Sequence, residues 1–303
     1  MKKINVSIAG ANTLLGQHLL ARFSRDKSIS VKSLHDALGS NPQSTLKNSQ
    51  QWQVGPQVAE HFSHTPLLPA DAPALAPIML SFLPDNGAEE IEEKHLDRGT
   101  RLITHCEYAR LNSPLALPGI TKFDIEARQL ATPNCTTAIC ALPLHQLHQA
   151  FGISHVTITT LQAISGTDIP GMPAHTIHDQ VIGHLHSETE ALSQELSVIF
   201  NNDFGIDSFA TRVPVWRGHT ITMSITLASK ADFKAVTNII SQTESLVIKE
   251  PPTTRDYFSP HAPLTTITNL RVIENRVLMV IKGDNLEAAT AGVMQSIAHM
   301  LDG

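Results

Sequence analysis

A cysteine at the start of a predicted helix is the first residue with a clear chemical use. Cys135 follows the segment TPN (132–134) and runs into an apolar stretch with helical spacing. Unpaired backbone N–H groups and the helix dipole at an N-terminus lower the pKa of a thiol and favour the thiolate. A thiolate attacks carbonyl carbon, so Cys135 is a candidate nucleophile. A packed core cysteine is the commoner alternative.

An arginine and a histidine lie close together in the segment RVPVWRGH (212–219). Arginine binds carboxylate and phosphate groups through paired donors, and histidine exchanges protons near neutral pH. Arg212 and His219 are an odd number of residues apart, so a straight strand would place them on opposite faces. They converge only if Pro214 or Gly218 bends the chain. Because the chain holds 16 histidines, a structural role for His219 is the alternative.

A glycine turn follows the first predicted strand. Residues 4–9 are apolar, the turn GANTLLG covers 10–16, and a helix is predicted over 17–23. Such a turn lets the backbone approach a pyrophosphate at the positive end of the helix. Thr13 stands near the place of the usual middle glycine, and an ordinary tight turn is the alternative. The residues predicted to contact a nucleotide here are Gly10, Asn12, Thr13, Leu14, Leu15 and Gly16.

Four histidines lie in the segment HTIHDQVIGHLH, at positions 175, 178, 184 and 186. Histidine clusters bind zinc when further ligands complete a set of four. No cysteine or tight group of carboxylates completes such a set here. We therefore favour a histidine-rich surface connection and predict no metal site.

Composition excludes several classes of protein. The net charge is −6, and lysines and arginines are scattered, so there is no footprint for nucleic acid or an anionic membrane. The longest apolar runs, such as 77–83, are too short to span a bilayer. Three cysteines in 303 residues argue for a reducing compartment. The N-terminus reads directly into a strand without a cleavage-site pattern, so we expect a cytoplasmic protein.

The order of predicted elements changes near Cys135. Before it, apolar strands alternate with helices, which is typical of a parallel sheet with helices on both faces. After it, β-rich segments dominate and predict an α+β domain around a mostly antiparallel sheet. The predicted strands are 30–34, 78–83, 101–104 and 156–164, the β-rich segments are 212–227 and 270–282, and the helices are 88–97, 188–200 and 286–301.

These elements predict an α/β protein of two domains. Residues 1–134 with 284–303 form a doubly wound, Rossmann-type nucleotide-binding domain, and residues 135–283 form an α+β catalytic and dimerisation domain. Ligands of such sheets bind beyond the carboxyl ends of the strands.

Taken together, the motifs resemble those of the aspartate-semialdehyde dehydrogenase family, in the same order over nearly the whole chain. That family has G-A-T-G-x-x-G where this chain has GANTLLG, and N-P-N-C-[ST] where it has TPNCTT. Its Q-x-x-S-G matches 162–166, and its R-V-P-V-x-x-[AG]-H matches 212–219. Its D-N-L-x-x-G-A matches from Asp284 to Ala289.

The resemblance implies a reaction and roles for its residues. The reaction is reductive dephosphorylation of aspartyl phosphate to aspartate semialdehyde through a Cys135 thioester, in lysine, methionine and threonine biosynthesis. His219 would act as general acid and base, and Gln162 would orient the substrate carbonyl. The residues implied to bind the substrate α-carboxylate, phosphate and amino group are, in that order, Arg212, Arg110 and Glu188.

The resemblance also implies an NADP cofactor and a homodimer or homotetramer. Further cofactor contacts are implied at Ser165, Gly166 and Asn285. Asp36, after the second strand, suits a free ribose hydroxyl better than the 2′-phosphate of NADP, so NAD stays an alternative.

Two departures from the family pattern concern phosphate binding. Ala191 stands where the family has a lysine that helps to hold phosphate, and Glu107 lies close to Arg110, where its charge would repel an anion. A non-catalytic or substrate-altered paralogue is therefore the alternative. The retained Cys135, Gln162, Arg212 and His219 favour the enzyme.

Overall fold

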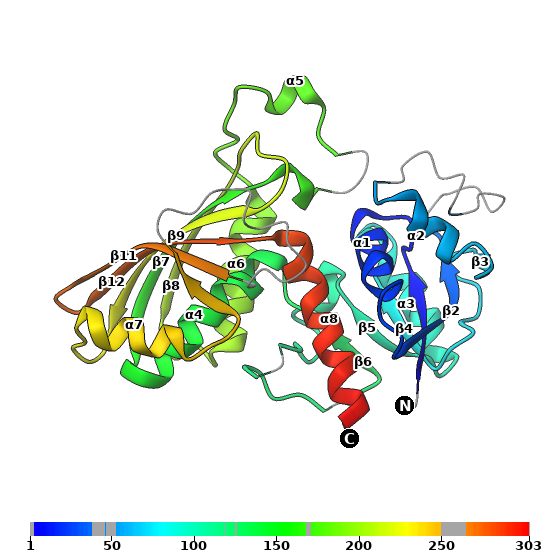
Figure 1. The fold of residues 1–303 in the computed structure, drawn as a ribbon, viewed down its shortest axis with the longest axis horizontal. Coiled ribbons are helices and arrows are strands. Elements are labelled where there is room, and N and C mark those ends of the chain that lie inside the picture. The colour runs from blue at the N-terminus through cyan, green and yellow to red at the C-terminus, as the bar shows by residue number, and fades with distance from the viewer. Residues whose placement is uncertain are drawn as a thin grey trace. The chain divides into compact units, whose positions relative to one another are not determined.

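The computed structural model describes residues 3–37, 46, 53–117, 119–124, 126–167, 171–249 and 265–302. The chain forms two compact units, whose elements are labelled in Figure 1. The N-terminal unit consists chiefly of Met1–Pro133 and Ala289–Gly303, and the C-terminal unit of Asn134–Thr167 and Gly171–Ala288.

The N-terminal unit contains a parallel sheet of six strands in the order β3-β2-β1-β4-β5-β6. Reversal of strand order on the two sides of β1 is the mark of a doubly wound sheet, so the predicted fold class is confirmed. The strands are β1 (Ile4–Ala9), β2 (Ile29–His35), β3 (Leu67–Leu68), β4 (Ile78–Ser81), β5 (Arg101–Thr104) and β6 (Gln129–Ala131).

Separate apolar clusters cover the two faces of this sheet. Neighbouring residues of a strand point to opposite faces. Ile8 packs in a cluster with residues of α1 (Leu14–Phe23), α2 (Pro56–His61) and the last turns of α8 (Asn285–Asp302). Ala9 packs in the other cluster with residues of α3 (Ala88–Asp97). A short 3-10 helix, η2 (Glu107–Ala109), follows β5.

The C-terminal unit contains a mixed sheet in the order β10-β11-β12-β9-β7-β8. The outer pairs β7–β8 and β10–β11 are parallel and the three central pairs are antiparallel, so the sheet is mostly antiparallel, as the sequence predicts. Its strands are β7 (Ile153–Gln162), β8 (Gly205–Arg212), β9 (His219–Leu227), β10 (Leu246–Ile248), β11 (Thr265–Ile273) and β12 (Arg276–Gly283).

Three helices pack along one side of this sheet (Figure 1). They are α4 (Cys135–Phe151), α6 (His186–Ile199) and α7 (Phe233–Ser241), and the shorter α5 (Ala174–Ile177) and η3 (Ile164–Gly166) lie in connections. On β7, residues at even positions from Val156 to Gln162 are buried, while the odd ones are half-buried. The buried row of β7 therefore ends at Gln162, which pairs in register with Arg212 of β8.

Several predicted boundaries are corrected by the structure. The β-rich segment 212–227 is not one strand, because β8 ends at Arg212 and β9 begins at His219. The segment 270–282 includes a tight turn between β11 and β12, where Glu274 adopts a positive φ of 55°. Strand β4 ends at Ser81 rather than 83, and residue 164 belongs to η3 rather than to a strand. No helix in the described ranges is long and apolar enough to cross a membrane.

Candidate active site around Cys135

Cys135 is the first residue of helix α4, and its neighbour Asn134 caps that helix. The Asn134 side-chain oxygen accepts a 2.8 Å hydrogen bond from the Thr136 N–H. The Asn134 N–H donates to Glu195 Oε2 at 2.7 Å, and its Nδ2 lies 3.3 Å from Glu188 Oε2. Hydrogen bonds of both the backbone and the side chain of Asn134 therefore fix the first turn of α4. The half-buried Cys135 thiol lies on this turn.

His219 faces the cysteine from the first position of β9. Its Nε2 lies 3.5 Å from the Cys135 sulfur, and its Nδ1 accepts a 3.0 Å hydrogen bond from the Ala163 N–H. The imidazole is almost fully buried. Burial, with a smaller effect from the Arg212 charge, lowers the pKa of His219 to about 3. The ring is therefore neutral around pH 7.

Arg212 lies at the end of β8 and is also buried. Its Nη1 donates to the Ala163 carbonyl oxygen at 2.9 Å, and its Nη2 lies 3.7 Å from Glu188 Oε1. Its Nε has no hydrogen-bond partner within the described ranges. Since a buried donor without a partner is costly, the guanidinium retains a capacity to bind an anionic ligand.

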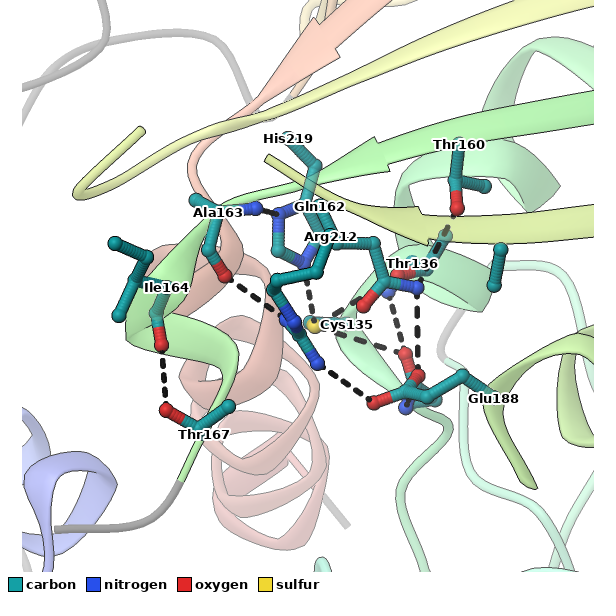
Figure 2. A network of polar contacts seen from close by, with 12 residues as sticks. Cys135, Thr136, Thr160, Gln162, Ala163, Ile164, Thr167, Glu188, Arg212 and His219 are labelled. Atoms are coloured by element: carbon teal, nitrogen blue, oxygen red, sulfur yellow. Dashed lines mark hydrogen bonds and ion pairs between the residues drawn. The ribbon is translucent and has the colours of Figure 1, made fainter. Parts of the chain in front are cut away.

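Gln162 and Glu188 complete the group of side chains around the sulfur. The Gln162 Nε2 lies 3.4 Å from Glu188 Oε2 and 3.5 Å from Thr160 Oγ1. Glu188, in the first turn of α6, thus accepts hydrogen bonds from Gln162 and Asn134. Figure 2 shows that Gln162, Glu188, Arg212 and His219 point toward Cys135 from three strands and a helix.

A bend between β8 and β9 brings Arg212 and His219 together, as the odd spacing requires. Gly218 has a φ of +89°, which glycine adopts without steric cost. The returning segment is held to η3, since the Ile164 N–H donates to the Val215 carbonyl and the Ser165 N–H to the Trp216 carbonyl.

The predicted cofactor residues of this unit also support the bend. Asn285 Oδ1 accepts hydrogen bonds from Ser165 Oγ at 3.0 Å and from the Gly218 N–H at 3.1 Å. A Cβ on Gly166 would lie 2.7 Å from Arg212 Nη1 and would displace the guanidinium. These contacts give Ser165, Gly166 and Asn285 a supporting role around Arg212 and His219.

Comparison with known proteins shows which proteins this chain is similar to. The family model "Semialdehyde dehydrogenase, dimerisation domain" matches residues 144–287. An aspartate-semialdehyde dehydrogenase of Methanothermobacter thermautotrophicus is 24% identical over 260 residues, which cover 77% of this chain and 74% of that protein. A solved structure titled aspartate semialdehyde dehydrogenase with NADP, from Candida albicans, superimposes with a TM-score of 0.85 at 20% identity and covers 99% of both chains. The chain is thus similar to aspartate-semialdehyde dehydrogenases over most of its length, and it shares their fold.

A protein named for a different activity is also similar to this chain. The malonyl CoA reductase (NADP) of Metallosphaera sedula is 24% identical over 213 residues, covering 61% of this chain and 60% of that protein. Similarity to both proteins shows that the scaffold alone does not specify the acyl substrate.

The glycine turn at residues 10–16 is a tight turn in the N-terminal unit. Gly10 has a φ of +70°, and a Cβ there would lie 2.3 Å from the Phe82 carbonyl oxygen. A Cβ on Gly16 would lie 2.1 Å from the Gly10 oxygen, so both positions require glycine. Thr13 caps α1 by accepting from the Gly16 N–H at 3.1 Å and donating to the Gly10 oxygen at 2.8 Å. Thr13 therefore replaces the missing glycine with a side-chain cap.

Other predicted nucleotide contacts surround this turn. Leu14 and Leu15 form the first turn of α1, where backbone N–H groups have no partner within the helix. Asn12 Oδ1 accepts a 2.7 Å hydrogen bond from the Ala37 N–H and so joins the turn to the end of β2. Asp36 lies there too and is buried, and its N–H donates to the Leu68 carbonyl.

Arg110 and Glu107 of the predicted phosphate site lie beside η2. Arg110 is buried, and its Nη2 donates to the His105 carbonyl oxygen at 2.8 Å. Glu107 is exposed, and its backbone N–H donates to Asp85 Oδ1. Phosphate binding by Arg110 stays a prediction.

The histidine-rich segment shows no metal centre in the part of the chain that the structure describes. No group of three or more His, Cys, Asp or Glu side chains converges there. His178 forms an exposed 3.1 Å pair with its neighbour Asp179, and the side chain of residue 186 lies outside the description.

Sequence reasoning missed two contributors to the site, Glu195 and Ala163. Glu195 is almost fully buried, and its carboxylate accepts the Asn134 N–H. A sequence signal for it exists, because Glu195 interrupts the apolar stripe formed by Leu192, Leu196 and Ile199 on α6. Ala163 acts through its backbone, which contacts both His219 and Arg212, and a backbone role leaves no mark on residue type.

Proposed function

We propose that this protein is a phosphorylating aspartate-semialdehyde dehydrogenase that interconverts aspartyl phosphate and aspartate semialdehyde through a thioester on Cys135. One observation carries the proposal: the sulfur at the start of α4 lies 3.5 Å from His219 Nε2, beside the oppositely charged Arg212 and Glu188. A nucleophile, an imidazole and a pair of opposite charges suit a substrate with an aldehyde and an amino-acid end.

Covalent chemistry begins at Cys135. In the oxidative direction the thiolate attacks the aldehyde carbon, a carbon–sulfur bond forms, and the carbonyl electron pair moves to oxygen. A bound nicotinamide cofactor supplies the hydride acceptor in this direction and the hydride donor in the other. A phosphate oxygen then attacks the resulting thioester, the carbon–sulfur bond breaks, and the Cys135 thiolate leaves. His219 is the residue that we assign to the reacting oxygen.

Charged side chains around the sulfur would orient the substrate. The Arg212 guanidinium would bind the α-carboxylate, since its Nε is unpartnered within the described ranges. The Glu188 carboxylate would bind the amino group, and Gln162 would orient the carbonyl oxygen. The Glu188–Arg212 distance of 3.7 Å exceeds that of a hydrogen-bonded pair, so substrate can compete for both groups.

We assign NADP as the cofactor. The first turn of α1 fits a pyrophosphate, because backbone N–H groups at a helix N-terminus attract anions, and the tight turn at Gly10 and Gly16 leads the chain from β1 into that helix. The Candida albicans structure is that of an aspartate semialdehyde dehydrogenase with NADP, and the Metallosphaera sedula relative is a malonyl CoA reductase (NADP). Asp36 after β2 is the feature that favours NAD, and the two cofactors are compared in the experiment below.

Inorganic phosphate and a second copy of the chain are the partners that we propose. Arg110 is the candidate phosphate ligand, while Ala191 leaves the family's lysine position without a charge. The matched family model is described as a dimerisation domain, which supports a homodimer or homotetramer formed through residues 135–283. Residues 1–134 with 284–303 would bind the nucleotide.

The test is phosphate-dependent reduction of NADP, and separately of NAD, with L-aspartate semialdehyde. The wild-type protein should catalyse the reaction, and Cys135→Ser should lower kcat by at least about 10⁴-fold. Cys140→Ala is the matched control on the same helix, because Cys140 is buried, and it should keep wild-type activity within about threefold. Folded wild-type protein that is inactive with both cofactors would favour the substrate-altered or non-catalytic paralogue.

A further inference from the structure

We propose that Arg217 and Asp284 form a positioning pair that fixes the bend between β8 and β9. The bend joins Arg212 to His219, so the pair sets the geometry of the groups that surround the Cys135 sulfur. The inference rests on the proposed function, because it concerns the arrangement in which that reaction takes place. It gives a role to two charged residues that lie outside the group of side chains around the sulfur.

The Arg217 guanidinium faces the Asp284 carboxylate at two points. Its Nε donates to Oδ1 at 2.9 Å, and its Nη2 lies 2.6 Å from Oδ2. The Asp284 side chain is 5% exposed and the Arg217 side chain 20%, so water screens this pair much less than a surface ion pair. Substitution of Arg217 would remove the positive charge that compensates a buried carboxylate, which is a costly change.

The Asp284 carboxylate is itself fixed in place. Its Oδ1 accepts from the Leu286 N–H at 3.1 Å and from the Glu287 N–H at 3.3 Å, and so caps α8. The preceding residue, Gly283, pairs in register with His219 at the end of the ladder between β9 and β12. The carboxylate is therefore a rigid anchor to which Arg217 holds the bend.

Other contacts of the bend with the β12–α8 junction are weaker. Pro214, Val215 and Trp216 are exposed, so their side chains do not hold the bend against the unit. The Gly218 N–H donates to Asn285 Oδ1 at 3.1 Å, which is a hydrogen bond between neutral groups. A hydrogen bond between charged groups is roughly twice as strong as a neutral one, so the Arg217 contact is the stronger of the two links.

A shift of the bend would affect bond formation more than substrate binding. His219 directly follows the bend, and its Nε2 lies 3.5 Å from the sulfur, so a displacement of the bend changes this distance. Arg212 precedes the bend, and it is held by pairing with Gln162 and by the Ala163 carbonyl oxygen. Misplacement of a reacting group by about 1 Å can lower a rate by about 10²-fold.

Steady-state kinetics with L-aspartate semialdehyde and phosphate test the positioning role. We expect Arg217→Ala to lower kcat by about 10–10²-fold with KM for the aldehyde within about threefold, and Arg217→Lys to recover most of kcat. Arg276→Ala is the control, because Arg276 is exposed at the opposite end of β12, and its kcat should stay within about twofold. An unchanged kcat in Arg217→Ala, or a KM that rises as much as kcat falls, would overturn the proposal.

A double-mutant cycle tests whether the two residues act as a pair. In Asp284→Ser the hydroxyl oxygen still caps α8, but the side chain is shorter and uncharged and so loses Arg217. We expect each single variant to lower kcat by about 10–10²-fold, and the double variant to lose no more than either one. Losses that multiply in the double variant would show that the residues act independently and would refute the pair.

Alkylation of Cys135 by iodoacetamide is a readout that needs no turnover. At pH 7.5 the rate in Arg217→Ala should change by at least about threefold, because the groups around a thiol determine its reactivity, and Arg276→Ala should match the wild type. An unchanged rate together with a lowered melting temperature would assign the pair to stability alone and overturn the proposal. Wild-type turnover tests the proposed function, so the two hypotheses can fail separately.

Discussion

The surroundings of Cys106 in the N-terminal unit and of Cys135 in the C-terminal unit differ in the groups that face the sulfur. The Cys106 sulfur is buried and lies 3.0 Å from Glu92 Oε1 and 3.3 Å from the Leu83 carbonyl oxygen, both of which are acceptors. The Cys135 sulfur is half-buried at a helix N-terminus, 3.5 Å from His219 Nε2 and 3.6 Å from the acceptor Asn134 Oδ1.

Glu92 is the centre of a hydrogen-bond network. Its carboxylate also accepts from Thr104 Oγ1 at 2.7 Å and from Tyr108 OH at 2.6 Å, and Gln129 Nε2 lies 3.2 Å away. Burial first, and then the Glu92 charge, raise the pKa of Cys106 well above its usual value. Acceptors around a sulfur keep the thiol protonated, whereas donors stabilise the thiolate. The comparison therefore assigns Cys106 to structure and Cys135 to chemistry.

Selective alkylation is the most direct test of this difference between Cys106 and Cys135. At pH 7.5 we expect iodoacetamide to modify Cys135 at least about 10³ times faster than Cys106, because Cys135 is half-buried at a helix N-terminus whereas Cys106 is buried against the Glu92 carboxylate. Mass spectrometry of tryptic peptides over time measures both rates. In urea the two rates should converge, and comparable rates in the native protein would refute the assignment.

Removing the positive charge beside Cys135 should have the next largest effect. Arg212→Gln deletes the guanidinium that holds the Ala163 carbonyl and faces Glu188, so we expect kcat/KM to fall by about 10²–10³ through loss of charge-assisted hydrogen bonds. Steady-state kinetics with aspartate semialdehyde measure the loss. Arg101→Gln is the control, since Arg101 forms an ion pair with the exposed Glu126 in the other unit. If both variants lose activity equally, the charge at position 212 has no special role.

Buried histidines in both units should make the protein sensitive to acid. Burial lowers the pKa of His35 to about 4 and that of His219 to about 3, so folding favours their neutral forms. Their contribution to stability is complete above pH 6.5 and is lost as pH falls toward the folded pKa, because the unfolded chain binds protons first. Between pH 6.5 and 4.5 each group should cost about 2 kcal/mol.

Urea unfolding at intervals from pH 7.5 to 4.5 measures this loss. His35→Asn should give a shallower dependence of the unfolding free energy on pH in this window. His35 accepts from or donates to Ser33 through Nε2 and lies 3.2 Å from the Pro69 carbonyl through Nδ1, so the variant should also be less stable at pH 7.5. A wild-type unfolding free energy that stays constant to pH 4.5 would contradict the lowered pKa values of His35 and His219.

The sequence predicted the elements and the residues of the site better than the contacts between them. The boundaries of α3 and β5 follow directly from apolar spacing, and Cys135, Gln162, Arg212 and His219 were named from motifs. Arg212 and His219 converge only because the chain bends between them, and residue spacing alone did not determine whether it bends. The positive φ of Gly218 provides that bend. Backbone contacts such as those of Ala163 depend on tertiary packing and have no sequence signature.

Glu195 allows a test with a smaller expected effect, because it places a negative charge near Cys135 in this comparison with Cys106. Its carboxylate is buried and accepts the Asn134 N–H at 2.7 Å, which fixes the cap of the Cys135 helix but opposes thiolate formation. Glu195→Gln keeps an acceptor for that N–H and removes the charge, whereas Glu195→Ala removes both.

We therefore expect Glu195→Gln to lower the thiol pKa of Cys135 with kcat within about threefold of wild type, and Glu195→Ala to lower kcat by about 10-fold. The pH dependence of iodoacetamide alkylation measures the thiol pKa, and steady-state kinetics measure kcat. A position needed only for folding would change the melting temperature and leave the alkylation profile unmoved. An unchanged profile in Glu195→Gln would thus show that the Glu195 charge does not alter the pKa of the Cys135 thiol. The difference from Cys106 would then come from the other groups around the two sulfurs.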